Sequence, residues 1–405
     1  MATLAPPPMA AADAGTVTTG GQPGGAPIVM VSSWWPTEND PHANPFVVDH
    51  ARALHRSGAV SCWLVAGGCR QVTGGFVRQG LDVGSVVTRH PRIPARLASR
   101  RSSARLLLAL GWLQGRASAH QRPRAVVLQS FSYAGPYAVG LARAFGCPLV
   151  YLEHWSAVGL RALTAREVAV LRRVLAGSDR VLAVSRYLAS ALEEIGGLAP
   201  GSVGVVENVV DPSRFAPRPP HRHPGTVIAH VADFRPVKGH GLLVDALLLL
   251  GPDHLDRLDL RFVLVGDGPE RASVQRRLAA VPDIAERVSF AGKLTREGVA
   301  EEMALADWTL LTSRVETSSC VARESLAVGR PVIAPRVGAL PELIGAGDGI
   351  LFERTPAALA AALLQAAGGG DPGSWQARAA AAAARFAPEA LDRFYRALVA
   401  ELGAR

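Results

Sequence analysis

The stretch from Trp308 to Leu351, WTLLTSRVETSSCVARESLAVGRPVIAPRVGALPELIGAGDGIL, decides the fold class of this chain. Its hydropathy pattern predicts an apolar strand at 308–312, a polar turn, a helix that stops at Gly329, and a second strand at 331–334. Such a succession is typical of parallel α/β sheets, in which ligands bind beyond the carboxyl ends of the strands. The polar turn is therefore expected to lie at a ligand site.

Two carboxylates, Glu316 and Glu324, stand eight residues apart on either side of the expected helix start. At about 1.5 Å per helical residue they lie at most roughly 12 Å apart, too far to share a proton. The helix N-terminus between them offers free N–H groups and a partial positive charge, which favour a phosphate. A sugar, a diphosphate and a ribose in that order would fit, although the spacing alone is more often that of two structural or solvated glutamates.

Other predicted strands also end in residues suited to ligand binding. Arg235 and Lys238 follow one strand and suit a diphosphate, the first as a guanidinium fork and the second as a point charge. Gly266 belongs to a glycine pair at the end of another strand, where a tight turn lets the backbone approach a ligand. His154 follows a strand in the first half and can bind a substrate oxygen. Each feature alone is more typical of a solvated turn or a structural histidine.

The length of 405 residues indicates two domains rather than one core. Strands and helices alternate on both sides of a proline-rich stretch, which predicts two α/β domains joined by a linker. The predicted organisation is a disordered tail at 1–25, an N-terminal domain at 26–211, a linker at 212–224, a C-terminal domain at 225–384 and a C-terminal helix within 385–405, whose docking the sequence does not predict.

Composition and charge restrict the function classes. The four cysteines match no metal motif, and no signal peptide or spanning segment is visible, so a reduced, cytoplasmic protein without a metal or cofactor is expected. The net charge is +9, and Val83 to Leu152 contains no acidic residue. Within that range the amphipathic segment Pro94 to Trp112 suits an anionic membrane surface, but it equally suits a solvated helix. No nucleic-acid-reading module is present.

Several motifs occur in a characteristic order along the chain. The motifs AVSRYLASAL (183–192), FRPVKGH (234–240) and LVGDGPE (264–270) precede ETSSCVARESLAVGRPVIAP (316–335). The last of these resembles the Glu, seven residues, Glu signature of glycosyltransferase family 4, a large family of retaining glycosyltransferases. This resemblance implies a GT-B fold, two Rossmann-like domains with parallel sheets that face each other across a cleft. The donor would bind mainly to the C-terminal domain and the acceptor mainly to the N-terminal one.

The resemblance also implies roles for individual residues. Glu316 would hydrogen-bond the hydroxyls of the donor sugar, and Glu324 would hydrogen-bond the ribose hydroxyls. Arg235 and Lys238 would neutralise the diphosphate, and His154 would lie beside the donor sugar. Further donor contacts are expected from the backbone of Ser319 and Cys320 at the diphosphate, of Lys293 and Leu294 at the base, and from Gly266 and Asn44.

Five positions depart from the family pattern, and two of them are Glu207 and Val209 of the hinge motif, where proline and glycine are usual. Thr317 stands where a glycine usually follows the first glutamate, and Asn44 stands where a glycine often lets the backbone approach the phosphates. Asp233 stands where many members carry an arginine five residues before the lysine, so we take Arg235 as its counterpart.

Together with the resemblance, the sequence predicts a retaining, metal-independent glycosyltransferase of the cytoplasm, peripheral at the inner face of the membrane if the basic segment binds lipid. It would move a sugar from a UDP- or GDP-sugar to a hydroxyl acceptor, which is a natural product, a polysaccharide or a lipid-linked molecule. The family often works without a protein nucleophile, so catalysis would rest on leaving-group stabilisation and positioning. The alternatives are a sugar-nucleotide epimerase or hydrolase of the same fold and a non-catalytic, transferase-like scaffold. The oligomeric state is not predicted.

Overall fold

The computed structural model describes residues 28–32, 34, 44–57, 62–66, 123–132, 134–221, 223–368 and 374–403. Two predictions concern other parts of the chain. The expected tail at 1–25 and the basic segment Pro94 to Trp112 both lie outside the described residues.

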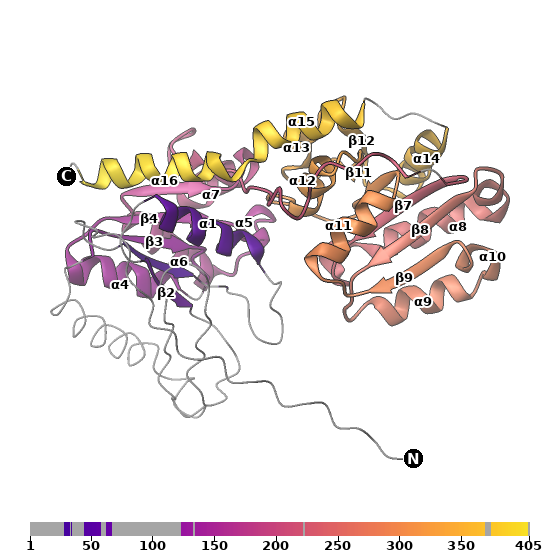
Figure 1. Cartoon of the computed structure of the whole chain (residues 1–405). Helices are drawn as coiled ribbons and strands as arrows, with labels where there is room; N and C mark the ends of the chain where they lie inside the picture. The colour runs from indigo at the N-terminus through magenta and orange to yellow at the C-terminus, as the bar shows by residue number, and fades with distance from the viewer. Residues whose placement is uncertain are drawn as a thin grey trace, which may run out of the picture.

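The described residues form two lobes, each built on a parallel sheet (Figure 1). In the N-terminal lobe the strands pair in the order β2-β1-β3-β4-β5-β6, and every pairing is parallel. Strands β1, β3 and β4 are buried along their whole length, as expected where helices cover both faces of a sheet. The strand bounds are β1 Ile28–Ser32, β2 Cys62–Ala66, β3 Ala125–Gln129, β4 Leu149–Glu153, β5 Arg180–Ala183 and β6 Gly204–Val205.

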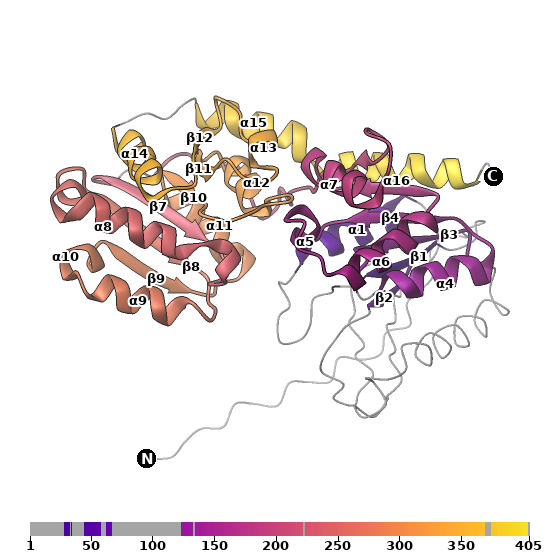
Figure 2. The ribbon, with the colours of Figure 1, turned by 180° about the vertical axis from the view of Figure 1, so that it is seen from behind.

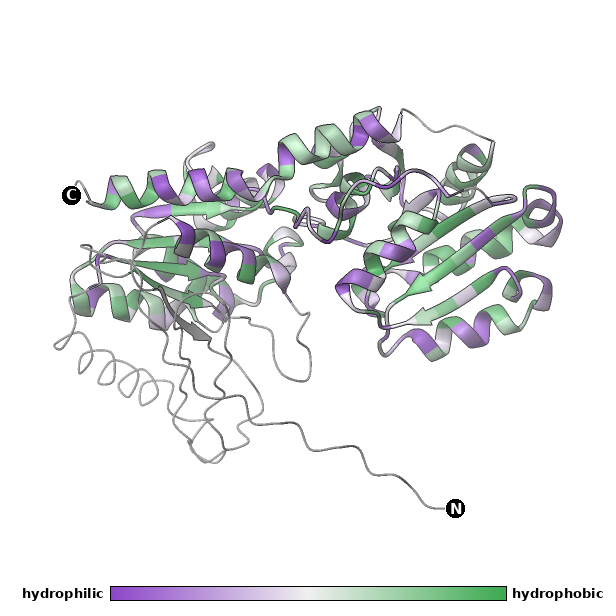
Figure 3. Ribbon diagram, in the orientation of Figure 1, coloured by the Kyte–Doolittle hydropathy of each residue, from purple (hydrophilic) through white to green (hydrophobic). Residues whose placement is uncertain are grey.

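The C-terminal lobe has the strand order β12-β11-β10-β7-β8-β9, again all parallel. Counted from its first strand, this is the doubly wound Rossmann order, with the direction of winding reversed between β7 and β10. Figure 3 shows the apolar strands enclosed by amphipathic helices in both lobes. The strand bounds are β7 Thr226–Val231, β8 Leu260–Val265, β9 Val288–Gly292, β10 Trp308–Leu310, β11 Val332–Pro335 and β12 Gly349–Phe352.

Helices cover the sheets of both lobes. Those of the N-terminal lobe are α1 Pro45–Arg56, α4 Gly135–Phe145, α5 Ser156–Gly159, α6 Ala165–Ala176 and α7 Arg186–Gly196. Those of the C-terminal lobe are the 3-10 turn η1 Pro236–Lys238 and the helices α8 His240–Arg257, α9 Arg271–Ala279, α10 Pro282–Ala285, α11 Arg296–Leu305, α12 Cys320–Ala327, α13 Leu340–Leu343 and α14 Pro356–Ala367. Two further helices, α15 Trp375–Phe386 and α16 Pro388–Gly403, end the described chain.

The predicted α/β class with two parallel-sheet domains is confirmed. The hydropathy pattern also predicts strands at 125–129, 226–231 and 260–265 and a helix over Gly135–Phe145, and these are present as β3, β7, β8 and α4. The prediction of a strand as far as Thr312 was wrong, because β10 ends at Leu310 and the next residues turn toward the site. The pattern further predicts a helix at 299–304, and this helix begins earlier, at Arg296, where the Thr295 side chain accepts the capping hydrogen bond from the Gly298 N–H.

The C-terminal helix docks on the N-terminal lobe. After α15 on the C-terminal lobe, α16 runs back along α1 (Figures 1 and 2). Arg56 of α1 holds the carboxylate of Asp392 in α16, with Nε to Oδ2 at 3.0 Å and Nη2 to Oδ1 at 2.8 Å. Tyr395 is buried in the core of that lobe. The end of the chain is therefore part of the N-terminal lobe's core.

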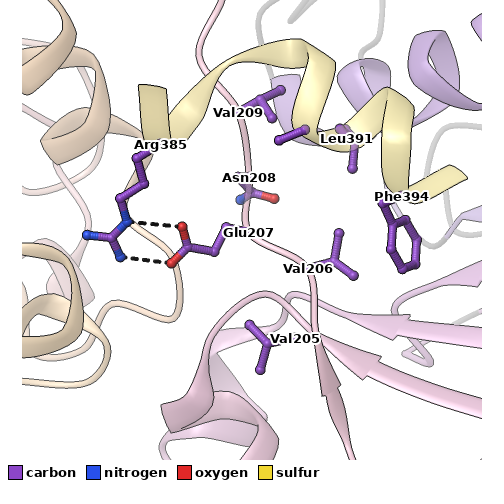
Figure 4. A pocket seen from close by; sticks show the side chains of 9 residues that line it. Val205, Val206, Glu207, Asn208, Val209, Arg385, Leu391 and Phe394 are labelled. Carbon is purple, nitrogen blue, oxygen red and sulfur yellow. Dashed lines mark hydrogen bonds and ion pairs between the residues drawn. The ribbon is translucent and has the colours of Figure 1, made fainter. Parts of the chain in front are cut away.

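The chain crosses between the lobes twice, and the two crossings lie side by side. A pocket of about 250 Å³ separates the segment that follows β6 from the joint of α15 and α16 (Figure 4). Arg385 grips both carboxylate oxygens of Glu207 there, at 2.9 and 3.2 Å, and the Val210 N–H donates to the Phe386 carbonyl at 2.9 Å. The contacts tie one crossing to the other.

Arg330 fastens the linker to the C-terminal lobe. This residue is 1% exposed, and its guanidinium donates to the carbonyls of Arg218 and Pro219 in the linker, both at 2.9 Å. It also donates to Ala304 and Ala306 at the end of α11, at 2.7 and 2.9 Å. One side chain thus satisfies carbonyls from two separate segments.

We expect Arg330→Met to lower the free energy of unfolding by about 2–3 kcal/mol, because methionine fills the volume but leaves buried carbonyls without donors. Urea unfolding followed by circular dichroism measures the change. Arg257→Met, at an exposed position near the end of α8, is the matched control and should stay within about 0.5 kcal/mol of the wild type. Equal urea midpoints for Arg330→Met and Arg257→Met would contradict the role of Arg330 in holding the linker on the C-terminal lobe.

Candidate functional site

The polar turn after β10 places Glu316 inside the protein. Its carboxylate is 8% exposed, and its Oε1 accepts hydrogen bonds from Lys238 Nζ and Ser313 Oγ, both at 2.7 Å. The two predicted residues Lys238 and Glu316 are thus brought together, although they come from different turns of the sheet's carboxyl edge. The result is a compact site with one cation and one anion.

Backbone contacts between the two turns fix this geometry. The Thr312 hydroxyl donates to the Lys238 carbonyl at 2.8 Å, and the Arg314 N–H donates to the Val237 carbonyl at 2.8 Å. Gly239 has φ +67°, and a Cβ at this position would lie 2.4 Å from the Thr312 carbonyl oxygen. Only glycine therefore allows the turn that carries Lys238 to approach the turn that carries Glu316.

The ion pair keeps Lys238 charged. Burial alone would lower the pKa of Lys238, but the adjacent Glu316 carboxylate outweighs it and holds the pKa above its ordinary value. The ammonium group is therefore cationic throughout the neutral pH range. A cation held at the edge of the sheet is suited to an anionic ligand group.

The N-terminus of α12 follows directly. The three hydroxyl residues at 317–319 stand in the sequence where a helix N-cap is expected, and the structure makes Ser319 the N-cap residue. Its hydroxyl accepts from the Ala322 N–H at 3.3 Å. Burial raises the pKa of the Cys320 thiol to about 12, so it stays protonated and unreactive. Beyond one turn of the helix, Glu324 is buried. The order carboxylate, helix N-terminus, carboxylate expected from the sequence is present.

Glu324 has a partner that the sequence did not reveal. Arg296, the first residue of α11, places Nη2 at 2.7 Å from the Glu324 Oε1, and both side chains are largely buried. Burial raises the pKa of Glu324 above its ordinary value, although the Arg296 guanidinium opposes the shift. The guanidinium also lies over the Phe215 ring, 4.9 Å from its centre. Arg296 therefore holds the Glu324 carboxylate in a largely buried ion pair.

The electrostatic contacts of Arg296 extend to the other lobe. Burial raises the pKa of Asp49 in α1 to about 6, and the charge of Arg296 opposes this shift more strongly than any other group. A carboxyl group of the N-terminal lobe thus senses the same guanidinium that binds Glu324. Arg296 therefore interacts both with Glu324 of the site and with Asp49 of the N-terminal lobe.

A second contact between the lobes lies next to Glu316. The Thr317 hydroxyl donates to the His154 carbonyl at 2.9 Å, and a Cβ at Gly159 would lie 3.1 Å from the Thr317 Cγ2. The threonine found where family members usually carry glycine therefore joins the two lobes. Figure 2 shows the helices α5 and α7, which flank this contact, on the side of the N-terminal lobe that faces the other lobe.

The carboxylate of Glu342 strengthens this interface. It accepts hydrogen bonds from the backbone N–H groups of Arg186, at 2.9 Å, and Tyr187, at 2.5 Å. These groups open helix α7, so a side chain of the C-terminal lobe occupies the helix N-terminus of the N-terminal lobe, where a negative charge is favourable.

His154 lies at this contact as a buried, neutral group. Its Nε2 is 2.6 Å from the Gln129 Oε1, and its ring stacks on Phe46 at 4.6 Å. Burial holds the pKa of His154 well below its ordinary value. The Glu153 carboxylate fixes the backbone by accepting from the N–H groups of His154 and Trp155, both at 2.7 Å. The predicted side chain is therefore held rigidly beside Thr317.

Three of the predicted site residues lie on turns where they are exposed or half-buried. Arg235 is exposed, with Asp233 at 3.8 Å, and the structure brings Lys238 rather than Arg235 to Glu316. Lys293 is exposed and Leu294 is half-buried on the turn between β9 and α11. Their roles at the diphosphate and the base stay predictions.

Two predicted backbone contacts have the conformation that close approach requires. Gly266 has φ +135°, and a Cβ there would lie 2.0 Å from the Ala232 carbonyl oxygen. Asn44, directly before α1, has φ +51°, the left-handed region that glycine favours and asparagine tolerates best among the other residues. The asparagine thus adopts a backbone conformation that glycine favours.

Two residues of the site were missed besides Arg296. Ser313 binds the Glu316 carboxylate, and Gly338 lets the chain pass beside the Glu316 backbone. Gly338 has φ +56°, and a Cβ there would lie 2.1 Å from the Glu316 carbonyl oxygen. A glycine two residues before the short helix α13 was the available signal for this approach.

Metal and membrane features were sought in the ranges that the structure describes. Within them, no group of three or more His, Cys, Asp and Glu side chains is placed to hold a metal ion, and metal independence stays a prediction. Among the same residues, no helix has both the length and the apolar character needed to span a bilayer.

Comparisons with known families and proteins agree with the resemblance. A family profile described as "Glycosyltransferase Family 4" matches residues 43–214, and one described as "Glycosyl transferases group 1" matches residues 225–368. The N-acetyl-alpha-D-glucosaminyl L-malate synthase of Bacillus anthracis is 36% identical over 122 residues, which are 30% of each chain. The D-inositol 3-phosphate glycosyltransferase of Thermomonospora curvata is 32% identical over 248 residues, 54% of this chain and 58% of that protein. The matches thus span about half or less of these relatives.

Solved structures of the same fold cover nearly the whole chain. Anabaena HepE in complex with UDP and glucose aligns with a TM-score of 0.69 and 16% identity over 92% of this chain and 99% of that chain. The sucrose-phosphate synthase of Thermosynechococcus elongatus aligns with a TM-score of 0.71 and 19% identity over 94% and 99% of the two chains. The two-lobed arrangement is the one these proteins share.

Proposed function

Because this chain belongs to glycosyltransferase family 4 and has the GT-B fold, we propose that it is a retaining, metal-independent hexosyltransferase. It moves a sugar from a UDP- or GDP-sugar to a hydroxyl acceptor. The observation that carries the proposal is the pairing of Lys238 with the buried Glu316 next to the N-terminus of α12, at a contact with the other lobe.

The chemistry follows from these groups. A leaving nucleoside diphosphate gains negative charge as its bond to the sugar breaks, and Lys238 together with the N–H groups of α12 stabilises that charge. Glu316 accepts hydrogen bonds from the sugar hydroxyls once Lys238 turns to the phosphate. Glu324 accepts hydrogen bonds from the ribose. The reaction then depends on stabilisation of the leaving group and on orientation of both substrates.

The relatives guide the choice of substrates. They include an N-acetyl-alpha-D-glucosaminyl L-malate synthase and a D-inositol 3-phosphate glycosyltransferase, and a structural neighbour was solved with UDP and glucose. GDP-mannose-dependent mannosyltransferases are also among the relatives. We therefore favour UDP- and GDP-sugars as donors and include small anionic hydroxyl compounds among the acceptors. Cytoplasmic location and a membrane contact through residues 94–112 remain predictions.

The test begins with thermal-shift measurements against UDP-, GDP- and other nucleotide sugars. The stabilising donor is then incubated with a panel of hydroxyl acceptors, and NMR of the product gives the anomeric configuration. We expect the configuration of the donor to be retained, and activity to be unchanged by a chelator. An inverted product would refute retention, and activity lost to the chelator and restored by a divalent ion would refute metal independence.

The same assay separates the alternatives. An epimerase or hydrolase would change or cleave the nucleotide sugar without an acceptor. A non-catalytic scaffold would bind the donor and leave it intact with every acceptor. Intact Lys238, Glu316 and Glu324 in one site favour the transferase.

A further inference from the structure

Helix α7 opens with backbone N–H groups whose partners come from two different lobes. Ser185 is the N-cap residue, and its hydroxyl accepts from the Leu188 N–H at 3.1 Å. The Arg186 and Tyr187 N–H groups instead donate to the Glu342 carboxylate, one to each oxygen, at 2.9 and 2.5 Å. The first turn of a helix has N–H groups that need partners from outside the helix. The start of α7 is therefore a socket that a carboxylate of the C-terminal lobe fills.

Glu342 belongs to α13, a short helix attached to the backbone of the candidate site. The Ala339 N–H, directly before α13, donates to the Glu316 carbonyl at 2.7 Å. Gly338 allows this approach, since a Cβ there would lie 2.1 Å from the same carbonyl oxygen. Glu342 follows Ala339 within one turn. The segment that reaches α7 thus also holds the backbone of Glu316.

The far end of α13 is held by Arg385. Its Nη2 donates to the Glu342 carbonyl at 3.2 Å, and its Nη1 donates to the Leu343 carbonyl at 3.3 Å. The same guanidinium binds the Glu207 carboxylate of the crossing segment. The Glu342 side chain is therefore carried by a backbone that is fixed at both ends.

On the N-terminal lobe, contacts lead from α7 back to the site. The Tyr187 hydroxyl donates to the Gly159 carbonyl at the end of α5. A Cβ at Gly159 would lie 2.8 Å from Tyr187 Cε1 and 3.1 Å from Thr317 Cγ2, so Gly159 lies between these two side chains. The Thr317 hydroxyl also binds the His154 carbonyl. The residue that follows Glu316 thus contacts the lobe whose helix α7 is held by Glu342.

We propose that Glu342 is a positioning residue, which latches the start of α7 to the segment that holds the Glu316 backbone and so keeps the N-terminal lobe over the donor site. The effect on sugar transfer rests on the proposed function, which makes that lobe the acceptor side. The latch itself does not, because it consists of contacts within the chain.

The latch is suited to open and close. A carboxylate at a helix N-terminus shifts an equilibrium by about twofold to thirtyfold, depending on its burial. Arg186 is exposed, so water replaces the carboxylate at the α7 N–H groups when the lobes separate. The latch therefore favours the closed arrangement without making it permanent.

The experiment uses Glu342→Gln, which keeps the length of the side chain but removes its charge and one of its two acceptor oxygens. Hydrogen–deuterium exchange of the ligand-free, full-length protein is followed at the opening turn of α7 and at the segment 156–160. We expect exchange to become about twofold to tenfold faster at both places, because release of α7 also withdraws Gly159 from Thr317. A carboxylate that only capped α7 would affect the first place alone.

Ser185→Ala is the matched control, because it removes the helix's own cap from the same turn and leaves the Glu342 contacts in place. It should speed exchange at the opening turn of α7 and leave exchange at 156–160 unchanged.

Kinetics separate positioning from donor binding. Lys238, Glu316 and Glu324 all belong to the C-terminal lobe, so thermal-shift titration of Glu342→Gln should give a donor affinity within about twofold of the wild type. The kcat for transfer should fall about twofold to tenfold, because a smaller fraction of the enzyme has the acceptor side in place. Ser185→Ala should keep the wild-type kcat.

Each outcome has a distinct meaning. Unchanged exchange at 156–160 or an unchanged kcat in Glu342→Gln overturns the positioning role. Donor affinity that falls as much as kcat overturns it as well, since Glu342 would then support only the donor turn. The same changes in Ser185→Ala would assign the effect to helix stability. If no donor is turned over with any acceptor, the proposed function fails, while the exchange measurement still decides the latch.

Discussion

Glu316→Gln is expected to reduce sugar transfer by about 10²–10³-fold in kcat, the usual effect of removing one group that stabilises a transition state. Glutamine keeps the shape of the side chain but loses the charge that orients Lys238 and replaces one of the two acceptor oxygens by an NH2 donor. In the ligand-free protein both Lys238 Nζ and Ser313 Oγ bind the same carboxylate oxygen at 2.7 Å. Steady-state kinetics with a saturating donor measures the effect.

In Glu316→Gln the loss of folding stability should be modest beside the loss of sugar transfer. Loss of the carboxylate leaves Lys238 without its partner in a partly buried position, at a cost of about 1–3 kcal/mol. Because the pKa of Lys238 is raised, the stabilisation it gives is present throughout the neutral range and is lost only as the pH rises through that raised pKa. Chemical unfolding at neutral pH therefore shows the full cost.

A double-mutant cycle with Lys238→Met is the control. The double variant Glu316→Gln/Lys238→Met carries no unpaired charge and should recover much of the lost stability, since the two changes are coupled. It should not recover transfer, because both substrate contacts are missing. Recovery of activity together with stability would show that the pair is only structural, and wild-type rates in Glu316→Gln alone would sink the assignment.

The sequence predicted the fold class because the alternation of apolar strands and amphipathic helices is a local signal. Residues 125–129 form a fully buried strand and residues 226–231 a strand that is buried in its middle. Their β-branched and aliphatic side chains predict both strands without any tertiary information. The Ser319 cap is equally local, since a hydroxyl followed by a helix start needs no distant partner. Features of this kind are readable from spacing alone.

The contacts that complete the site are not local. Lys238 and Glu316 are 78 positions apart, and only the family pattern related them before the structure joined them. Arg296 and Glu324 come from neighbouring helices, and no pattern in the sequence distinguishes Arg296 from the many other arginines of this chain. Tyr395 reaches His50 from 345 positions away. Such pairs depend on how helices dock, which periodicity does not encode.

The structural consequences of two departures from the family pattern are known only from the three-dimensional structure. Asn44 has a positive φ, which glycine favours and asparagine tolerates, so that departure is compatible with a glycine-like turn. Thr317 replaces a glycine and adds a hydrogen bond to the opposite lobe, so that departure adds a contact. The same kind of substitution thus has two different consequences, which the sequence alone could not separate.

Arg296→Leu is expected to weaken donor binding by about tenfold to a hundredfold and to make it depend on pH. Arg296 binds the buried carboxylate of Glu324 at 2.7 Å, and a charge-assisted hydrogen bond of this kind has an effect of that size. Removing one partner of a buried pair also destabilises a protein by about 3–5 kcal/mol. Donor titration by thermal shift or calorimetry, repeated across neutral and acidic pH, measures the loss of donor affinity and its dependence on pH.

The sign of the pH dependence follows from burial. Burial already raises the pKa of Glu324 above its ordinary value, and loss of Arg296 raises it further, so Glu324 takes up a proton at a higher pH than in the wild type. The protonated group is a poorer acceptor for ribose hydroxyls, and donor affinity in Arg296→Leu should fall as the pH is lowered. Stability should change in the opposite direction. A carboxyl group whose pKa is higher in the folded state destabilises the fold increasingly as the pH rises from the unfolded pKa through the folded one.

Two further variants show which group titrates. Arg296→Lys restores a positive charge. It should recover much of the donor affinity and remove most of the pH dependence of donor binding. Asp49→Asn in the Arg296→Leu background removes the other carboxyl group that Arg296 influences, whose pKa is raised to about 6. If the pH dependence persists in that double variant, Glu324 is its source. If it disappears, Asp49 at the interface between the lobes is the titrating group, and the assignment of Glu324 as the ribose acceptor loses its support from Arg296.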